Sequence, residues 1–502
     1  MLEPRRIEDS LLRWRTETEP CGALVDGERT LELGQVALWS LRFAHHLASR
    51  GVEPGDRVAI FLDHVAEAVV AIYGTWIAGA LAVPIHPSLK SPQVAHILHH
   101  SGSRVLVSAP HKLATLDGAT LAGVRAVAVP PSGTLDGEEK ARVLQSLFPG
   151  GDAPAAILYT SGSTGRPKGI LVSHANLRAG ARIVSRYLGL RRDERILSVL
   201  PFSFDYGLNQ LLSAVRCGCT LVLQRSHFPG DVVRSLARER ITGLAGVPPF
   251  WVQLMRAAGN RLELPHLRYI TNSGGVFPTE LVRRYREQLP QARIFLMYGL
   301  SEAFRSTYLS PEEVDRRPDS IGRAIPENEV LVLDAHGAPC APDEPGELVH
   351  RGPTVSLGYW NDPEATARVF RPDPCDPGSI RKVVHSGDIV RRDAEGYLYF
   401  VGRRDQLIKT HGYRVSPDEV EELIHDSKLV AEVAVHGRPD EVSGAAIVAH
   451  VIPADPPAFA ASALLEYCRT RMPPYMVPRF VEVHDALPRT PSGKIDRKAL
   501  AQ

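Results

Sequence analysis

A stretch rich in glycine, hydroxyl and cationic side chains, LYTSGSTGRPKGILVSH, lies between two apolar runs at residues 158–174. Its glycines, Gly162, Gly165 and Gly169, allow backbone conformations that are closed to other residues. Backbone amides and hydroxyls in such a loop can surround an anion, and Lys168 adds a positive charge. The hydroxyls are those of Thr160, Ser161, Ser163 and Thr164. These residue types predict a loop that holds a polyphosphate, with an ordinary surface turn as the alternative.

The stretch does not fit a Walker A loop, whose pattern is G-x-x-x-x-G-K-[ST]. Counted from Gly162, Pro167 stands where the second glycine belongs, and Gly169 replaces the Mg²⁺-binding hydroxyl. The apolar run ILVSH that follows predicts a strand, whereas a Walker A loop opens a helix. We therefore expect a hairpin loop between two strands.

The elements that must position this loop alternate between strand and helix patterns from about residue 30 to 330. Runs such as 57–62, 103–108 and 292–299 predict short buried strands, and amphipathic segments separate them. This alternation predicts α/β layers with largely parallel sheets. Shorter strands between turns at 320–400 predict an antiparallel sheet or barrel, and the last hundred residues predict a compact α+β unit.

The composition narrows the class of protein. A length of 502 residues with 44% hydrophobic residues predicts more than one domain. The formal net charge of +1 argues against nucleic acid or an anionic membrane as the main partner. Six cysteines do not form a disulfide framework, and the N-terminus lacks the apolar core of a signal peptide. The uncharged run at 68–85 contains glycines and a proline and predicts a buried helix and strand instead of a membrane span. We expect a cytoplasmic protein.

Four motifs, in a fixed order along the chain, resemble the adenylate-forming superfamily of acyl-CoA synthetases, amino-acid adenylation domains and luciferases. They are YTSGSTGRPKG, YGLSEA at Tyr298–Ala303, the segment from His385 to Glu421, and PRTPSGKIDRKAL at Pro488–Leu500. Other stretches, such as LPFSFDYGLNQL, resemble stand-alone AMP-forming acyl-CoA ligases of the exosortase-associated type.

The resemblance implies a fold and a reaction. It implies a large N-terminal domain, residues 1–403, of layered αβαβα sheets with a small β-barrel-like subdomain. A smaller, mobile α+β domain, residues 404–502, would carry the catalytic lysine and rotate about the hinge residue Asp405. The implied reaction joins a carboxylic acid to the α-phosphate of ATP, with Mg²⁺, and releases pyrophosphate. A thiol of CoA or of a phosphopantetheinylated carrier protein then displaces AMP.

The resemblance also assigns residues to the nucleotide. Lys168 and the loop would hold the β- and γ-phosphates, Glu302 would bind Mg²⁺, and Lys494 would bridge the carboxylate and the α-phosphate. Asp388 and Arg403 would contact the ribose. The remaining adenosine-phosphate contacts implied are Gly274, Gly275, Tyr298, Gly299 and Ser301. Gly412 would line the tunnel for the thiol, next to an atypical His411.

The residues that select the acid are predicted less directly. Asp205 matches the aspartate that holds the ammonium of an amino acid in related enzymes, but it also fits the N-cap of the following helix. Arg305 predicts either a contact to a second anionic group or a structural salt bridge. Other positions that the resemblance places in the pocket are Asn209, Thr271, Ser273 and Met297. Together these residues predict a small polar acid or an amino acid as substrate.

Three other functions stay open at this stage. One is an acyl-CoA synthetase for a fatty or aromatic acid, and another is a luciferase-like oxygenase that adenylates its substrate. The third is a non-catalytic nucleotide-binding relative, which the presence of Lys168, Glu302 and Lys494 disfavours. The acceptor thiol would come from a separate carrier protein or from CoA.

Overall fold

The computed structural model of the chain describes residues 6–17, 21–130, 151–161, 167–226, 228–259, 261–275, 277–376, 378, 381–404, 406, 408–410, 413–440, 444–472, 474, 476–490 and 493–501. The chain divides into two compact units. The first unit comprises Met1–Val330 and His350–Val384, and the second comprises Leu331–Val349 and His385–Gln502.

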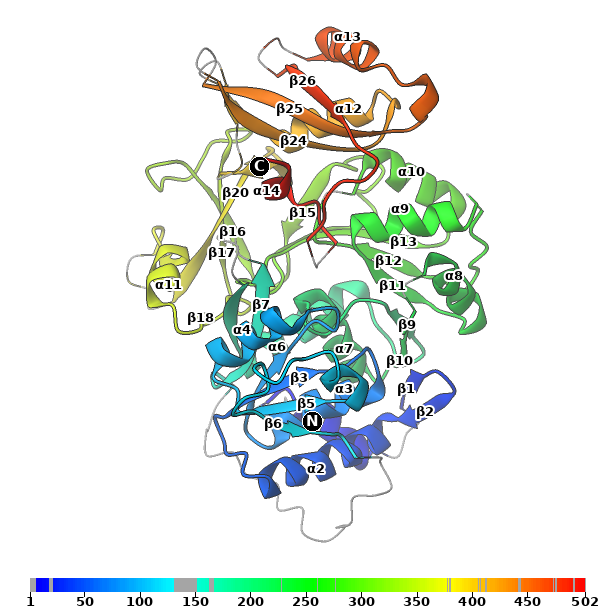
Figure 1. Cartoon of the computed structure of the whole chain (residues 1–502), viewed down its shortest axis with the longest axis vertical. Coiled ribbons are helices and arrows are strands. Elements are labelled where there is room, and N and C mark those ends of the chain that lie inside the picture. Colours follow the sequence, from blue (N-terminus) through cyan, green and yellow to red (C-terminus); the bar gives the residue numbers. More distant parts are fainter. Residues whose placement is uncertain are drawn as a thin grey trace. The chain divides into compact units, whose positions relative to one another are not determined.

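Two sheets form the framework of the first unit (Figure 1). In one sheet the order β13-β12-β11-β9-β10-β1 is parallel throughout, and β2, β14 and β15 extend it with antiparallel pairings. Its strands are β1 (Ala23–Asp26), β2 (Arg29–Glu32), β9 (Arg195–Ser198), β10 (Thr220–Leu223), β11 (Gly243–Gly246), β12 (Tyr269–Asn272), β13 (Arg293–Tyr298), β14 (Thr307–Leu309) and β15 (Ser320–Ala324).

The other sheet has the order β18-β8-β7-β4-β3-β5-β6. Its strands are β3 (Arg57–Phe61), β4 (Leu81–Pro84), β5 (Val105–Ser108), β6 (Arg125–Val127), β7 (Pro154–Ser161), β8 (Pro167–Ser173) and β18 (Gly358–Tyr359). The pairings of β7 with β8 and of β8 with β18 are antiparallel, whereas β7-β4-β3-β5-β6 are parallel. The predicted strands of this region are confirmed.

A single hydrophobic core links the two sheets through four helices. These are α2 (Leu33–Ser49), α3 (Ala66–Ile77), α6 (His174–Leu188) and α7 (Asp205–Cys217). Buried residues of the helices, such as Phe43 and Trp76, join one cluster with residues of both sheets, such as Ile60 and Leu221. Further helices lie outside this core: α4 (Ser91–Ser101) packs against the other face of the β7 sheet, and α8 (Pro229–Arg238), α9 (Pro248–Ala257) and α10 (Thr279–Gln288) lie beside β11–β13 (Figure 1). The predicted αβαβα layering is therefore confirmed.

Helix ends in the core follow local sequence signals. The N-cap of α6 is Ser173, whose hydroxyl accepts a hydrogen bond from the Asn176 amide while the Asn176 side chain binds back, as in a capping box. Gly189 and Gly218 end α6 and α7 in the left-handed conformation that glycine adopts without steric cost. The Ser173 cap starts α6 directly at the end of β8, and the two glycines end α6 and α7.

The second unit contains short antiparallel strands and then a compact α+β region. Strands β16 (Glu329–Leu333), β17 (Gly346–Arg351), β20 (Lys382–Arg392) and β21 (Leu398–Arg403) run side by side in that order, in the part predicted to be barrel-like. The α+β region contains β22 (Ile408–Thr410), β23 (Tyr413–Val415), α12 (Pro417–His425), β24 (Val430–Asp440), β25 (Gly444–Pro453), α13 (Ala461–Arg471), β26 (Phe480–Val483) and α14 (Arg497–Leu500). One face of the sheet β24-β25-β26 packs against α12 and α13 through residues such as Val435, Ile447 and Leu464 (Figure 1).

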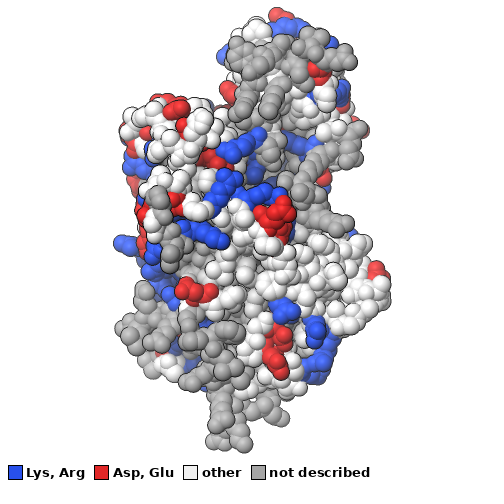
Figure 2. All heavy atoms as spheres, turned by 90° about the vertical axis from the view of Figure 1, so that its left-hand side faces the viewer, with Lys and Arg blue, Asp and Glu red and all other residues white. Residues whose placement is uncertain are grey.

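Several expectations about the class of protein also have structural outcomes. All six cysteines are free thiols. Within the described residues, no helix combines the length and the apolar character that a membrane crossing requires. Basic and acidic side chains are interspersed on the face shown in Figure 2. The domain boundary predicted at residue 404 is the point about which the C-terminal domain is expected to rotate. It stays a prediction, because the hinge residue Asp405 lies outside the described residues.

Candidate active site

The predicted phosphate loop is the connection of a β-hairpin. Strands β7 and β8 are antiparallel, with Thr160 directly opposite Lys168, so a strand and not a helix follows the lysine. A Cβ atom at Gly169 would lie 2.7 Å from Ile157 Cγ2 and 3.2 Å from Cζ of Tyr159, so only glycine allows this close approach. The loop residues Gly162, Ser163, Thr164 and Gly165 lie outside the described residues, as does the side chain of Ser161.

Two histidines of α4 hold the hairpin from the side. Nδ1 of His100 lies 2.8 Å from the Tyr159 hydroxyl, and Nε2 of His96 lies 3.2 Å from the Pro167 carbonyl oxygen. The two rings stack with centroids 5.5 Å apart. Sequence reasoning missed both residues, although their i, i+4 spacing places them on one face of a helix. Because they contact both strands close to the loop, they hold the hairpin from which the loop projects.

Tyr359 brings the predicted phosphate lysine and the predicted metal ligand together. Its hydroxyl donates a hydrogen bond of 2.6 Å to Oε1 of Glu302, and Nζ of Lys168 lies 5.4 Å from the centroid of its ring. The register of β18 on β8 places Tyr359 opposite Ile170, and the amide of Trp360 donates to the Gly169 carbonyl at 2.8 Å. Sequence reasoning missed Tyr359, which contributes the contact between the two motifs.

We expect Tyr359→Phe to lower the rate of adenylation by about tenfold, because a hydrogen bond to a charged group contributes about 1.5 kcal/mol or more. The Mg²⁺ concentration for half-maximal rate should rise, since the Glu302 carboxylate loses the contact that orients it. Initial rates measured across a Mg²⁺ titration check both effects. Tyr399→Phe is the matched control, because its hydroxyl also donates to a carboxylate, that of Asp393, at 3.2 Å. An unchanged Mg²⁺ dependence in the Tyr359 variant would contradict this role.

The predicted adenine contacts lie in two turns at the same edge of the parallel sheet. Strands β12 and β13 are adjacent, so the segments that follow them are neighbours. Gly274 has φ of +81°, a backbone conformation that favours glycine, and the Asn272 side chain donates to the carbonyl of Gly275 at 3.1 Å. After β13, the ring of Tyr298 stacks on buried His350 with centroids 6.0 Å apart. Gly299 and Ser301 belong to the same turn, and His350 was missed by sequence reasoning.

One segment holds both ends of the turn from Glu302 to Arg305. The Ser356 amide donates to the Glu302 carbonyl at 2.9 Å, and the Thr354 hydroxyl donates to the Arg305 carbonyl at 3.0 Å. Between these ends, Phe304 adopts a φ of +52° and is fully buried. The turn therefore fixes the predicted metal ligand and a predicted pocket residue through the same support.

Asp205 and Arg305 form a buried ion pair. Oδ2 of Asp205 lies 3.8 Å from Nη1 of Arg305, and the two side chains are 4% and 3% exposed. The guanidinium also lies over the ring of Tyr206, 4.5 Å from its centroid. The N-cap of α7 is Phe204, and Asp205 is the first helical residue, so the N-cap interpretation of Asp205 is wrong.

The other predicted pocket residues are also buried and polar contacts surround them. The Tyr206 hydroxyl contacts the side chain and the carbonyl of Thr271, and the Tyr187 hydroxyl donates to the sulfur of Met297 at 3.0 Å. Burial raises the pKa of both tyrosines, which therefore remain neutral donors. Asn209 and Ser273 are each 2% exposed.

The two predicted ribose contacts lie together in the second unit. Asp388 on β20 and Arg403 on β21 are directly opposite each other, with 2.8 Å between Oδ1 and Nη1. The Ser386 hydroxyl accepts a hydrogen bond from the Asp388 amide at 3.0 Å. Glu347, which sequence reasoning missed, lies beside them and pairs with His385 at 2.8 Å.

Lys494 lies in a closed turn of the second unit. The Thr490 amide donates to the Lys494 carbonyl at 2.8 Å, and the Asp496 amide donates to the Pro488 carbonyl at 2.8 Å. Three residues after the lysine, Arg497 binds two carboxylates of α12, those of Asp418 and Glu421, at 2.8 and 2.7 Å. Burial alone lowers the pKa of Arg497, but these carboxylates outweigh it and raise that pKa. The turn is thus fastened to α12. The predicted tunnel residue Gly412, like His411, lies outside the described residues.

Comparison with known proteins identifies the family. Residues 13–360 match the model of the AMP-binding enzyme family, and residues 419–494 match the AMP-binding enzyme C-terminal domain. The chain belongs to the AMP-binding enzyme family. It is an enzyme of the adenylate-forming superfamily, so the predicted family, fold and type of reaction are confirmed.

Individual relatives of this AMP-binding enzyme cover nearly its whole length. Feruloyl-CoA synthase of an Amycolatopsis species is 34% identical over 477 residues, which are 94% of each chain. A linear gramicidin synthase polypeptide of Brevibacillus parabrevis is 32% identical over 96% of this chain, which spans only 6% of that protein. The solved structure of o-succinylbenzoate CoA synthetase from Bacillus subtilis, in complex with its acyl-adenylate intermediate, superimposes with a TM-score of 0.88 at 28% identity, over 100% of this chain and 99% of that one.

Proposed function

We propose that this AMP-binding enzyme activates a small carboxylic acid that carries a second polar group, and then transfers the acyl group to the thiol of CoA. The buried pair of Asp205 and Arg305 carries the proposal for the acid. A pocket for a long alkyl chain gains its binding energy from apolar surface, and a buried ion pair is costly to place there.

The guanidinium of Arg305 also has hydrogen-bond donors that could bind the substrate. Within the described residues, its Nε and Nη2 are buried and have no hydrogen-bond partner. Buried polar groups are nearly always hydrogen-bonded, so an acceptor group on the substrate is expected to complete the set. A carboxylate, carbonyl or hydroxyl oxygen would suit these donors, and Asp205 would accept from an amino or hydroxyl group.

In the first half-reaction, a carboxylate oxygen of the acid attacks the α-phosphorus of ATP. The bond from that phosphorus to the oxygen bridging to the β-phosphate breaks, and pyrophosphate leaves with the electron pair. Lys168 offsets charge on the departing phosphates, and Lys494 stabilises the charge that develops between the carboxylate and the α-phosphate. Glu302 fits as a ligand of Mg²⁺, because it is a hard oxygen donor whose Oε1 is oriented by Tyr359. When bound, Mg²⁺ neutralises phosphate charge.

In the second half-reaction, the sulfur of the thiol attacks the acyl carbon and gives up its proton to the solvent, and AMP leaves with the electrons of the broken C–O bond. CoA is the proposed acceptor because feruloyl-CoA synthase matches this chain over 94% of both lengths. A carrier-protein thiol is the second candidate, favoured by the 32% identity to the gramicidin synthase polypeptide.

Pyrophosphate exchange into ATP tests the choice of acid. The panel contains succinate, amino- and hydroxybenzoates, α-amino acids, and saturated fatty acids from hexanoate to palmitate. We expect exchange with acids that carry a polar group. Rates for the long fatty acids should be lower by about 10²-fold, because leaving a buried polar group unpaired costs about 1–3 kcal/mol. Exchange supported only by hexanoate to palmitate would refute the polar pocket. With the preferred acid as substrate, the rates of thioester formation on CoA and on a phosphopantetheinylated carrier protein are then compared, and the faster reaction identifies the acceptor.

A further inference from the structure

Three histidines and one glutamate meet on one face of the small sheet in the second unit. His436 lies on β24, His450 on β25 and Glu482 on β26, and His484 follows β26 directly. In the sheet register His450 is opposite Glu482, so their side chains leave the sheet on the same side. The other face of this sheet carries the hydrophobic core with α12 and α13, which these four residues do not join.

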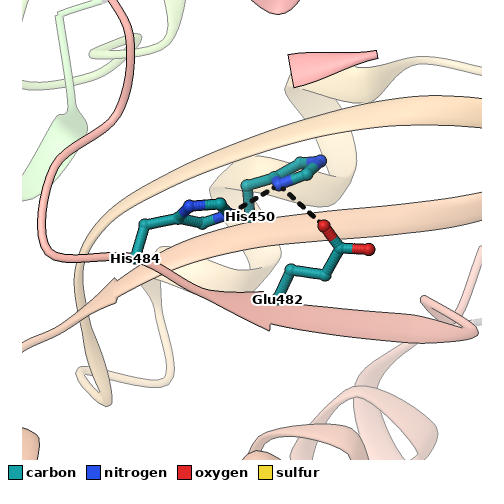
Figure 3. A group of neighbouring side chains, drawn as sticks. All are labelled: His450, Glu482 and His484. Carbon is teal, nitrogen blue, oxygen red and sulfur yellow. Dashed lines mark hydrogen bonds and ion pairs between the residues drawn. The ribbon is translucent and has the colours of Figure 1, made fainter. Parts of the chain in front are cut away.

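Three of these side chains present ligand atoms to one common point. Nδ1 of His450 lies 2.8 Å from Nε2 of His484 and 3.4 Å from Oε2 of Glu482, and Figure 3 shows these groups facing one another. All three ligand atoms lie within 4.8 Å of each other. Ligands on a tetrahedral zinc ion are separated by about 3.3 Å, given zinc–ligand bonds of about 2.0–2.1 Å. The distance between His450 and Glu482 already fits this geometry, and a shift of the His484 ring by about half an ångström would bring the distance between His450 and His484 to it.

Outer partners orient two of the three ligands. Nε2 of His450 lies 3.1 Å from Nδ1 of His436, so a proton on His450 Nε2 can be donated there while Nδ1 keeps its lone pair. The Arg438 guanidinium binds Oε1 of Glu482 at 2.5 Å, which leaves Oε2 as the oxygen that faces His450. Such second contacts to a histidine and a carboxylate are typical of protein metal sites.

We propose that His450, His484 and Glu482 form a Zn²⁺ site on the C-terminal sheet. Two imidazole nitrogens and one carboxylate oxygen suit zinc, whereas Mg²⁺ and Ca²⁺ take oxygen ligands almost exclusively. The three residues belong to the second unit, whereas Glu302 belongs to the first. It joins β25 to β26 and to the start of the chain that continues to Lys494, so bound zinc would stiffen that connection.

Metal binding to the full-length, tag-free protein tests this site. The protein is treated with a chelator, and Zn²⁺ is titrated in competition with a chromophoric indicator, in buffer free of nucleotide and phosphate. We expect one Zn²⁺ per chain and a higher thermal unfolding temperature with the metal, because a ligand that binds the folded state stabilises it. Equal concentrations of Mg²⁺ or Ca²⁺ should have no such effect.

Two variants and a matched control make the result specific. His484→Ala and Glu482→Gln change partly exposed side chains, and each should weaken Zn²⁺ binding by about tenfold or more. The control His111→Ala removes an exposed histidine that pairs with Asp63 at 2.6 Å in the first unit, and it should bind Zn²⁺ as the unaltered protein does. Circular dichroism verifies folding, and substitution of Co²⁺ gives visible absorption bands that report the ligand set. Absence of stoichiometric binding, or equal affinity in all variants, would overturn the proposal.

Discussion

Lys494→Ala is expected to lower the rate of pyrophosphate exchange by about 10²–10³-fold, the loss found when a fixed donor at a developing charge is removed. The physical reason is that the ammonium stabilises charge in the transition state more than it stabilises bound ATP. Exchange kinetics at saturating acid, together with the Kd for ATP from calorimetry, measure the two quantities separately.

Contacts of the backbone and of Arg497 hold the surrounding turn, and they should remain in this variant. The hydrogen bonds that close the turn use the backbone carbonyls of Lys494 and Pro488, and the Arg497 contacts to α12 do not involve the lysine side chain. Lys382→Ala, which removes an exposed lysine of β20, is the control for a simple loss of positive charge. Full exchange in the Lys494 variant, or an equal loss in the control, would show that this lysine is not the catalytic cation.

Arg305→Met should destabilise the protein by about 3–5 kcal/mol, because it leaves the Asp205 carboxylate buried without its cation. The double variant Asp205→Asn with Arg305→Met should recover most of this loss, since replacing both partners of a buried pair is often close to neutral. Urea unfolding followed by tryptophan fluorescence gives the three free energies of unfolding. The double variant should also activate apolar acids better relative to polar ones.

An exposed ion pair provides the comparison. Arg391 and Asp343 lie 3.0 Å apart, but their side chains are 40% and 62% exposed. Exposed pairs contribute about 0–1 kcal/mol, so Arg391→Met should have little effect on stability. If Arg305→Met were no more destabilising than Arg391→Met, the burial of the pair would not carry the energy assigned to it.

Whether a site residue could be predicted from the sequence depends on whether its partners lie in the same short segment of the chain. The phosphate-loop hairpin was predictable because glycines, hydroxyls and Lys168 lie within one short segment flanked by apolar runs. The link between Lys168 and Glu302 was not predictable, because it depends on Tyr359, which is 57 residues from Glu302 and has no motif of its own. The same applies to His350, which only the fold brings onto Tyr298.

Asp205 shows a different reason for a wrong interpretation. An aspartate before an apolar helix pattern is a good N-cap by composition, yet Phe204 occupies that position. The buried cation Arg305, from a turn 100 positions along the chain, lies within ion-pair distance of the carboxylate. A tertiary partner of this kind overrides a local preference, and the sequence pattern around Asp205 contains no sign of it.

The turn from Glu302 to Arg305 has a consequence for attempts to redesign this enzyme. The segment Thr354–Ser356 donates hydrogen bonds to the carbonyls at both ends of the turn. One of these carbonyls belongs to Glu302, the proposed Mg²⁺ ligand, and the other belongs to Arg305, the proposed contact to the acid. A substitution that fits a new substrate by moving this backbone would therefore also move Glu302, on which the reaction rate is proposed to depend. Laboratory evolution at Arg305 should accordingly yield variants that combine an altered substrate preference with slower catalysis. Further substitutions that restore the rate should accumulate in Thr354–Ser356.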